Sequence, residues 1–167
     1  HFYDLHKPYG EFSNFHAAPI QLDGHVWPTT EHYFQAQKFV THKTHFQHIQ
    51  QAGTPRDAFN YARAHRSSVR SDWPSVKDDV MFKACMAKFQ QHHGLKQLLL
   101  STDDRTLVEH TTNDSYWGDN GDGTVTVTTD GESETVDMEG LSFSEKSILV
   151  FTRNCLFHTL FNLYPFR

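Results

Sequence analysis

The chain has 167 residues, a length that suits one domain with a hydrophobic core and is short for two. Hydrophobic residues make up 37% and charged residues 21%, a composition typical of a globular protein rather than a disordered one. The net charge of −5 and the lack of a long basic run argue against a protein that holds duplex DNA mainly through its phosphates.

Cysteine and histidine usage limits the compartment and the cofactors. Cys85 and Cys155 fit two reduced thiols better than a disulfide. The sequence shows no signal-peptide pattern and no apolar run of membrane-spanning length. We therefore expect an intracellular protein, cytoplasmic or nuclear, without a membrane partner. The 13 histidines show no zinc-ligand spacing, so the sequence predicts no metal and no cofactor.

The N-terminal part combines a loop, a hairpin and several helices. Residues 1–19 mix aromatic residues with turn formers, which predicts a loop with short extended pieces. The pair Asp23-Gly24 separates 20–22 from 25–27 and predicts a tight β-hairpin. A Thr cap then opens a helix from Glu31 to about residue 40. We expect further helices over 46–52 and, after Thr54, over 55–64.

Toward the C-terminus the longest helix is expected from residue 75, opened by Trp73-Pro74, to about residue 91. Residues 95–100 predict another helix, and 107–110 a short strand before a turn-rich loop over 113–123. Thr/Val alternation predicts a β-hairpin of 124–129 and 132–136, whereas 141–167 is ambiguous between helix and strand. The chain should be mainly α, a single compact helical domain with a small β component.

The helix beginning near Glu31 carries a polar stripe. Glu31, Gln35, Lys38 and His42 recur at helical spacing, opposite an apolar face that includes Tyr33, Ala36 and Val40. One interpretation is a solvated helix surface. The other is a carboxylate held beside an amide and an amine, where it protonates a leaving base or activates water. Periodicity leaves both open.

The Trp73 helix contains a lysine within its apolar stripe. Lys77 lies among Trp73, Val80, Met81 and Ala84. Such a lysine either extends to solvent or is desolvated, and desolvation lowers the pKa of an amine. A neutral amine is able to attack the anomeric carbon of a ribose. Lys77 is therefore a candidate nucleophile, with Lys38 as its competitor.

Two further segments are candidates for ligand binding. The loop over 113–123 brackets Tyr116 and Trp117 with Asp and Gly, which suits close approach to a ligand or a plain surface turn. Three arginines, Arg63, Arg66 and Arg70, are equally consistent with a pyrophosphate site and with a solvated cluster.

Seven blocks of sequence together resemble the NADAR (NAD and ADP-ribose) superfamily, the YbiA-like N-glycosidases. They are F-S-N-F at 12–15, D-G-x-x-W-P-T-x-E-H-Y-F-Q-A-Q-K-F at 23–39, R-x-x-W at 70–73, V-K-x-x-V-M at 76–81, K-F at 88–89, L-V-E-H-T at 107–111 and N-D-x-Y-W-G-D at 113–119. The W-P-T-x-E-H-Y-F-Q block is the most specific. The resemblance covers about residues 9–123.

The resemblance implies a mainly α fold that hydrolyses N-glycosides of nucleotide sugars without a cofactor. It implies Glu31 as the essential carboxylate, and Lys38, Lys77 and Asp114 as further catalytic candidates. The expected ligand-binding residues lie in the matching blocks or in the arginine cluster: Ser13, Asn14, Phe15, Trp27, His32, Gln35, Arg63, Arg70, Trp73, Tyr116, Trp117, Gly118 and Asp119.

The expected ligand is ADP-ribose or a related nucleotide-sugar, with ADP-ribosylated guanine in DNA or RNA as the leading substrate. Phosphoribosylated intermediates of riboflavin synthesis are the alternative substrate, and a non-catalytic ADP-ribose reader is the alternative class. Members of the family usually continue with N-x-L-G-x-x-L-M, which is absent after Thr124. We therefore expect a family domain over 1–123 and a divergent segment over 124–167 packed on the same domain.

Overall fold

The computed structural model describes residues 5–102, 107, 109, 116–118, 124–129 and 132–137. Its contacts divide the chain into two compact units. One unit spans residues 14–100, and the other combines residues 1–13 with 101–167. Among the described residues, no helix is long and apolar enough to cross a membrane.

The 14–100 unit begins with a tight hairpin of β1 (Ile20–Leu22) and β2 (His25–Trp27). The strands are antiparallel, with Ile20 opposite Trp27. Asp23 and Gly24 at the turn both have positive φ, 51° and 76°. A two-residue turn with this backbone matches the twist of the strands it joins, which is why Asp-Gly predicted it correctly.

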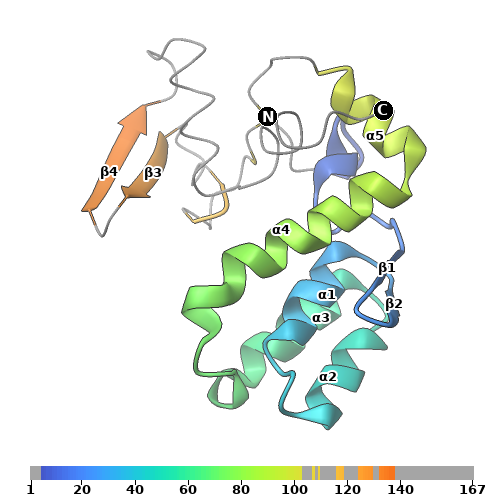
Figure 1. Cartoon of the computed structure of the whole chain (residues 1–167), viewed down its shortest axis with the longest axis vertical. Coiled ribbons are helices and arrows are strands. Elements are labelled where there is room, and N and C mark those ends of the chain that lie inside the picture. Colours follow the sequence, from blue (N-terminus) through green and yellow to red (C-terminus); the bar gives the residue numbers. More distant parts are fainter. Residues whose placement is uncertain are drawn as a thin grey trace. The chain divides into compact units, whose positions relative to one another are not determined.

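The central element of this unit is α1 (Thr30–Gln37). It packs against α2 (Lys43–Gln50), α3 (Pro55–Ala64) and α4 (Trp73–Gln91), and α4 crosses over it in Figure 1. Because neighbours surround α1, every residue from Thr30 to Ala36 is buried. The helix ends three residues before the predicted Val40, which is exposed and therefore not part of a core face.

The other helices follow the predicted order with shifted ends. α2 begins three residues before the predicted residue 46, whereas α3 begins at Pro55 as predicted, with the Thr54 hydroxyl accepting from the Asp57 amide at 3.1 Å. A 3-10 turn, η2 (Arg66–Ser68), leads to α4. After α4, α5 (His93–Leu100) starts two residues earlier than predicted.

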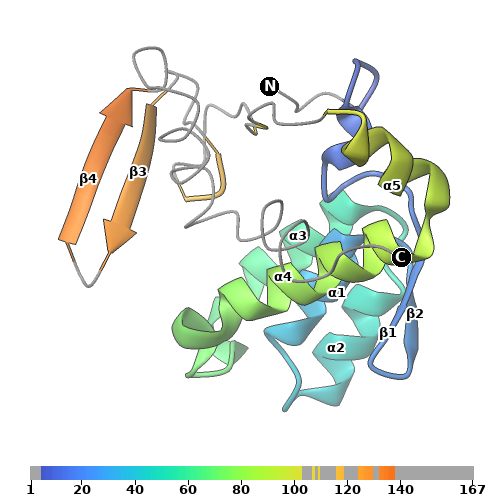
Figure 2. The ribbon, with the colours of Figure 1, turned by 45° about the horizontal axis from the view of Figure 1, so that its top comes forward.

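The second half of α4 is held to the hairpin (Figure 2). The Gln91 side chain accepts from the Gln21 amide and donates to the Gln21 carbonyl, both at 2.8 Å. The Gln91 side-chain amide thus makes the two backbone hydrogen bonds that a further strand beside β1 would make. The buried residues of α4 begin at Met81 and include Cys85 and Lys88, whereas the residues of α4 before Met81, Lys77 included, are half-buried or exposed.

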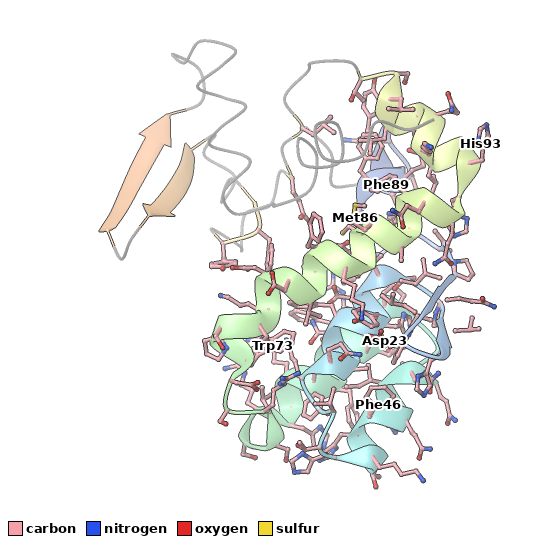
Figure 3. The ribbon with its side chains drawn as sticks, viewed as in Figure 1. Asp23, Phe46, Trp73, Met86, Phe89 and His93 are labelled. Atoms are coloured by element: carbon pink, nitrogen blue, oxygen red, sulfur yellow. The ribbon has the colours of Figure 1, made fainter. Side chains whose placement is uncertain are left out.

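A core of large and small side chains fills the space between these elements (Figure 3). Alanines from α1, α3 and α4 allow the helices to approach closely. Trp27 is fully buried, with its ring edge-to-face against Tyr33 and Phe46 and its Nε1–H donating to the Leu22 carbonyl at 3.0 Å. Both its surface and its only donor are therefore used by the fold.

The other unit contains a 3-10 turn and a second hairpin. η1 (Gly10–Phe12) lies within the segment predicted as loop. β3 (Thr124–Thr129) and β4 (Glu132–Asp137) pair antiparallel, which confirms the hairpin predicted from Thr/Val alternation. Of the predicted 107–110 strand, Leu107 and Glu109 are described, and 141–167 lies outside the described residues. The fold is mainly α with a small β component, as predicted.

Candidate functional site

The first turn of α1 is fixed by its cap and by a loop from earlier in the chain. Thr29 caps the helix, accepting from the His32 amide at 3.3 Å. The Asn14 carbonyl accepts from the Glu31 amide at 3.1 Å, and the Thr30 hydroxyl lies 2.8 Å from Asn14 Oδ1. The backbone position of Glu31 is therefore set by the Thr29 cap and by the loop at Asn14.

Glu31 is a buried carboxylate with an amide donor beside it. Its side chain is 6% exposed, and Gln35 Nε2 donates to its Oε1 at 2.7 Å. A helix N-terminus and an amide donor both stabilise negative charge. Gln35 is itself 3% exposed. The interpretation of this stripe as a solvated helix surface is thus wrong for Glu31 and Gln35.

Lys38 follows α1 as its C-cap residue, and its amine lies against two aromatic rings. Lys38 Nζ is 5.2 Å from the ring centre of Phe34 and 5.4 Å from that of Trp73. The two rings contact each other edge-to-face with their centres 4.9 Å apart. Trp73 lies at the start of α4, labelled in Figure 3. In this position the amine has lost part of its hydration, and cation–π contacts with the two rings partly replace it.

The pKa of Lys38 is lowered from its ordinary value, mainly because burial removes water from the charged amine. The Glu31 carboxylate opposes this shift, and the positive charges of Arg66 and Lys77 add to it. The charges of Glu31, Arg66 and Lys77 therefore all act on the Lys38 amine. Lys38 is therefore the lysine for which the structure gives both a contact with two rings and a lowered pKa.

The predicted arginines occupy different surroundings. Arg70 extends both arms of its guanidinium to Asp72, with Nε–Oδ1 at 2.5 Å and Nη2–Oδ2 at 2.6 Å, and this ion pair raises the pKa of Arg70. Arg63 is exposed in the last turn of α3. Arg66, in η2, is the arginine whose charge reaches Lys38. Of the three predicted arginines, Arg66 is therefore the one whose charge acts on the pKa of Lys38.

His32 faces the interior with both ring nitrogens bonded. Nε2 lies 3.1 Å from the Ala52 carbonyl and Nδ1 lies 2.8 Å from the Thr29 hydroxyl. Burial lowers the pKa of His32. A neutral ring that donates from Nε2 and accepts at Nδ1 satisfies both contacts. The fold itself thus uses every polar atom of His32, as it does with Trp27.

Of the remaining predicted residues, some are the first residues of the 14–100 unit and the others belong to the other unit. Asn14 and Phe15 are half-buried, and the Arg56 guanidinium lies 4.9 Å from the Phe15 ring centre. In the other unit, Ser13 and Gly118 are buried, and the half-buried rings of Tyr116 and Trp117 meet edge-to-face. Asp114 and Asp119 lie outside the described residues.

Two contributors escaped prediction although the sequence carries a signal for each. Phe34 precedes Lys38 by four residues, the spacing at which helical side chains meet. Arg66 was recognised only as one of a cluster, because its effect on Lys38 depends on the fold: the Arg70 amide donates to the Lys38 carbonyl at 2.9 Å and so brings this segment to Lys38. The contact between Trp73 and Phe34 could not be predicted from the sequence, because the two residues are far apart in the chain and meet only in the fold.

Known proteins resemble this chain in sequence and in structure. The family model described as the NADAR domain matches residues 1–137. The N-glycosidase YbiA of Escherichia coli is 51% identical over 122 residues, covering 73% of this chain and 76% of that protein. An N-glycosidase of Nostoc punctiforme is 41% identical over 120 residues, covering 71% of this chain and 77% of that protein.

A solved structure agrees with the fold. The NMR structure of E. coli YbiA superposes with a TM-score of 0.66 at 51% identity and covers 72% of this chain and 71% of that one. A riboflavin biosynthesis protein of Vibrio vulnificus is 36% identical over 123 residues but is matched over only 33% of its own length. The chain belongs to the NADAR domain family, among the N-glycosidases, which are hydrolases of N-glycosyl bonds.

Proposed function

We propose that this chain hydrolyses the bond between ribose and base in ADP-ribosylated guanine of nucleic acid, binding the ADP-ribose half. The observation that carries the proposal is the placement of a buried carboxylate and an amine of lowered pKa at the two ends of α1. Cleavage of an N-glycosidic bond passes through a sugar with positive charge at C1 and a departing base that needs a proton.

Glu31 suits the charge that develops at the sugar. Its backbone is held by the Asn14 carbonyl and its carboxylate accepts a hydrogen bond from Gln35. A buried anion stabilises a neighbouring cationic sugar strongly, because little water screens the interaction. Glu31 then accepts the proton from the attacking water, or from the attacking amine.

Lys38 suits nucleophilic attack at C1. An amine whose pKa is lowered is more often neutral, and only a neutral amine has a lone pair for attack. Attack at C1 forms a carbon–nitrogen bond and breaks the bond to the base, and the proton that the amine loses passes through Glu31 to the departing base. Water later cleaves the carbon–nitrogen bond, which frees the sugar and regenerates the amine. Lys77 and Arg66 add positive charge nearby, which fits the phosphates of a nucleotide-sugar.

A second candidate substrate comes from the relatives. Two of them, from Vibrio vulnificus and from Zea mays, are named riboflavin biosynthesis proteins. A phosphoribosylated pyrimidine of that pathway presents the same N-glycosidic bond and a phosphate but no adenosine. The same carboxylate and amine suit the N-glycosidic bond of this smaller substrate.

The purified chain incubated with guanine-ADP-ribosylated DNA and, separately, with the phosphoribosyl pyrimidine decides between these substrates. Release of ADP-ribose from the DNA at the higher kcat/KM supports the proposal. Release of sugar from the pyrimidine alone favours the riboflavin pathway. Binding of ADP-ribose without turnover of either substrate points to a reader and contradicts the proposal.

A further inference from the structure

With the described residues, the Gln35 side chain makes one hydrogen bond, although its amide has two donors and an acceptor. Its amide nitrogen donates to Glu31 Oε1 at 2.7 Å. Its amide oxygen, Oε1, is buried and accepts no hydrogen bond from the described residues. The side chain is 3% exposed. Buried polar atoms in native proteins are nearly always bonded, so an unpaired acceptor calls for a donor.

The orientation of this amide is fixed by its neighbour. If the group were reversed, its oxygen would face the Glu31 carboxylate, and two acceptors would repel each other. The nitrogen therefore points to Glu31 and the oxygen points away from that bond. Both atoms belong to one planar group, so the unpaired acceptor lies next to the carboxylate.

We infer that Gln35 Oε1 accepts a hydrogen bond from the ribose 2′-hydroxyl of the substrate, which makes Gln35 a specificity residue for ribosides over 2′-deoxyribosides. The inference rests on the proposed function, because it takes C1 of the sugar to lie at Glu31. The hydroxyl on the carbon next to C1 is then the nearest donor that the substrate offers. Hydrogen bonds to this hydroxyl strengthen as the sugar becomes cationic.

Gln35 thereby links recognition to chemistry. One end of its amide holds the carboxylate that acts at C1, and the other end reads the neighbouring hydroxyl. A substrate without that hydroxyl leaves the acceptor buried and unpaired. Sites of this kind reject an analogue that lacks the bonded group more strongly than apolar sites reject one that lacks a methylene.

The test compares kcat/KM for two substrates, both guanine adducts of ADP-ribose in DNA. In one the ribose attached to guanine through the cleaved bond has its 2′-hydroxyl, and in the other that ribose is the 2′-deoxy form. The 2′-deoxy bond is intrinsically more labile, so the quantity measured is the riboside-to-deoxyriboside ratio in each variant relative to the unaltered chain. In Gln35→Met, which keeps the length and removes both polar atoms, we expect this ratio to fall about 10-fold or more. Gln47→Met, at an exposed position on α2, is the matched control and should leave the ratio unchanged.

A purely structural role gives a different result. If Gln35 only orients Glu31, Gln35→Met slows both substrates equally and the ratio stays within about twofold of the starting value, which overturns the inference. Gln35→Glu supplies a second check, because a protonated carboxyl donates to Glu31 and keeps an acceptor oxygen. This variant should retain more of the ratio than Gln35→Met does, and an equal loss in both overturns the inference.

Failure of the proposed function is recognised separately. If the guanine adduct is not hydrolysed, the ratio is measured on the phosphoribosyl pyrimidine and its 2′-deoxy form. If neither is hydrolysed, dissociation constants for ADP-ribose and its analogue lacking the 2′-hydroxyl of the reacting ribose provide the ratio by calorimetry. In each case a ratio that does not respond to Gln35→Met contradicts the role of Gln35.

Discussion

Lys38 combines a cationic side chain with surroundings that disfavour its charge. Phe34 and Trp73 cover its amine, and burial outweighs the attraction of Glu31 in setting its pKa. In the described structure Lys77 has a different part, since its charge contributes to the lowering at Lys38. We therefore propose that Lys38 supplies the nucleophile and that Lys77 supplies positive potential beside it.

Chemical trapping tests this division. Borohydride added with ADP-ribose should reduce the imine that a lysine forms with the open-chain sugar, and peptide mapping should place the adduct on Lys38. Lys43, exposed at the start of α2, is the matched control and should remain unmodified. Trapping should also persist to lower pH than for an ordinary lysine, because a lowered pKa leaves more neutral amine. An adduct on Lys77 alone would reverse the assignment.

At this scale the sequence predicted the residue types but not their surroundings. The W-P-T-x-E-H-Y-F-Q block made Glu31 and Gln35 candidates, yet helical periodicity alone could not show that their side of the helix is buried rather than solvated. The difference is made by α4 and by the Asn14 loop, which cover α1 from distant parts of the chain. Lys77 attracted attention for its apolar neighbours in sequence, although the first turns of α4 lack a buried residue.

Among the elements, α1 depends on its cap more than an exposed helix does. Thr29 is buried, and its hydroxyl bonds both the backbone and the ring of His32. We expect Thr29→Val to lower the free energy of unfolding by about 1–3 kcal/mol, because the variant leaves buried groups of His32 unpaired. Chemical denaturation measures the change.

The matched control for this prediction is the cap of α3. Thr54 is exposed, and its hydroxyl bonds the amide and the carboxylate of Asp57. Thr54→Val should cost about 1 kcal/mol, since water replaces the lost partner. Equal losses at the two caps would show that burial of the Thr29 network adds nothing to α1.

Capping and turn signals explain which elements the sequence predicted well. Asp23-Gly24 and Thr54-Pro55 determine backbone geometry locally, and both β1–β2 and the start of α3 agree with the prediction. The ends of α1, α2 and α5 were less accurate, because packing against neighbours rather than a local signal sets them. The family model matches residues 1–137, which include β3 and β4, and the domain boundary at residue 123 stays a prediction.

For the whole molecule, burial of a neutral histidine makes stability depend on pH. The pKa of His32 is lowered below its ordinary value of 6.5, chiefly by burial. When the pH falls below about 6.5, His32 binds a proton more readily in the unfolded chain than in the folded chain. The contribution of His32 is therefore present above about pH 6.5 and is lost as the pH falls through its folded pKa.

Urea unfolding at about pH 7.5 and about pH 5.5 measures this effect. The unaltered chain should lose more stability on acidification than His32→Gln does, because the variant has no proton to bind at this position. His45, whose pKa burial and neighbouring histidines also lower, titrates in both proteins and cancels in the comparison. An identical loss in the two proteins would contradict the assignment of a neutral, buried His32.

The central claim is that Glu31 performs the chemistry of N-glycoside cleavage at the N-terminus of α1. Its most direct test is release of ADP-ribose from guanine-ADP-ribosylated DNA by the unaltered chain, by Glu31→Gln and by Asp79→Asn, a control at an exposed position on α4. Glu31→Gln should fold and bind ADP-ribose yet lower kcat by about 100-fold or more, with Asp79→Asn unchanged. A folded Glu31→Gln that releases ADP-ribose at the starting rate would contradict the claim.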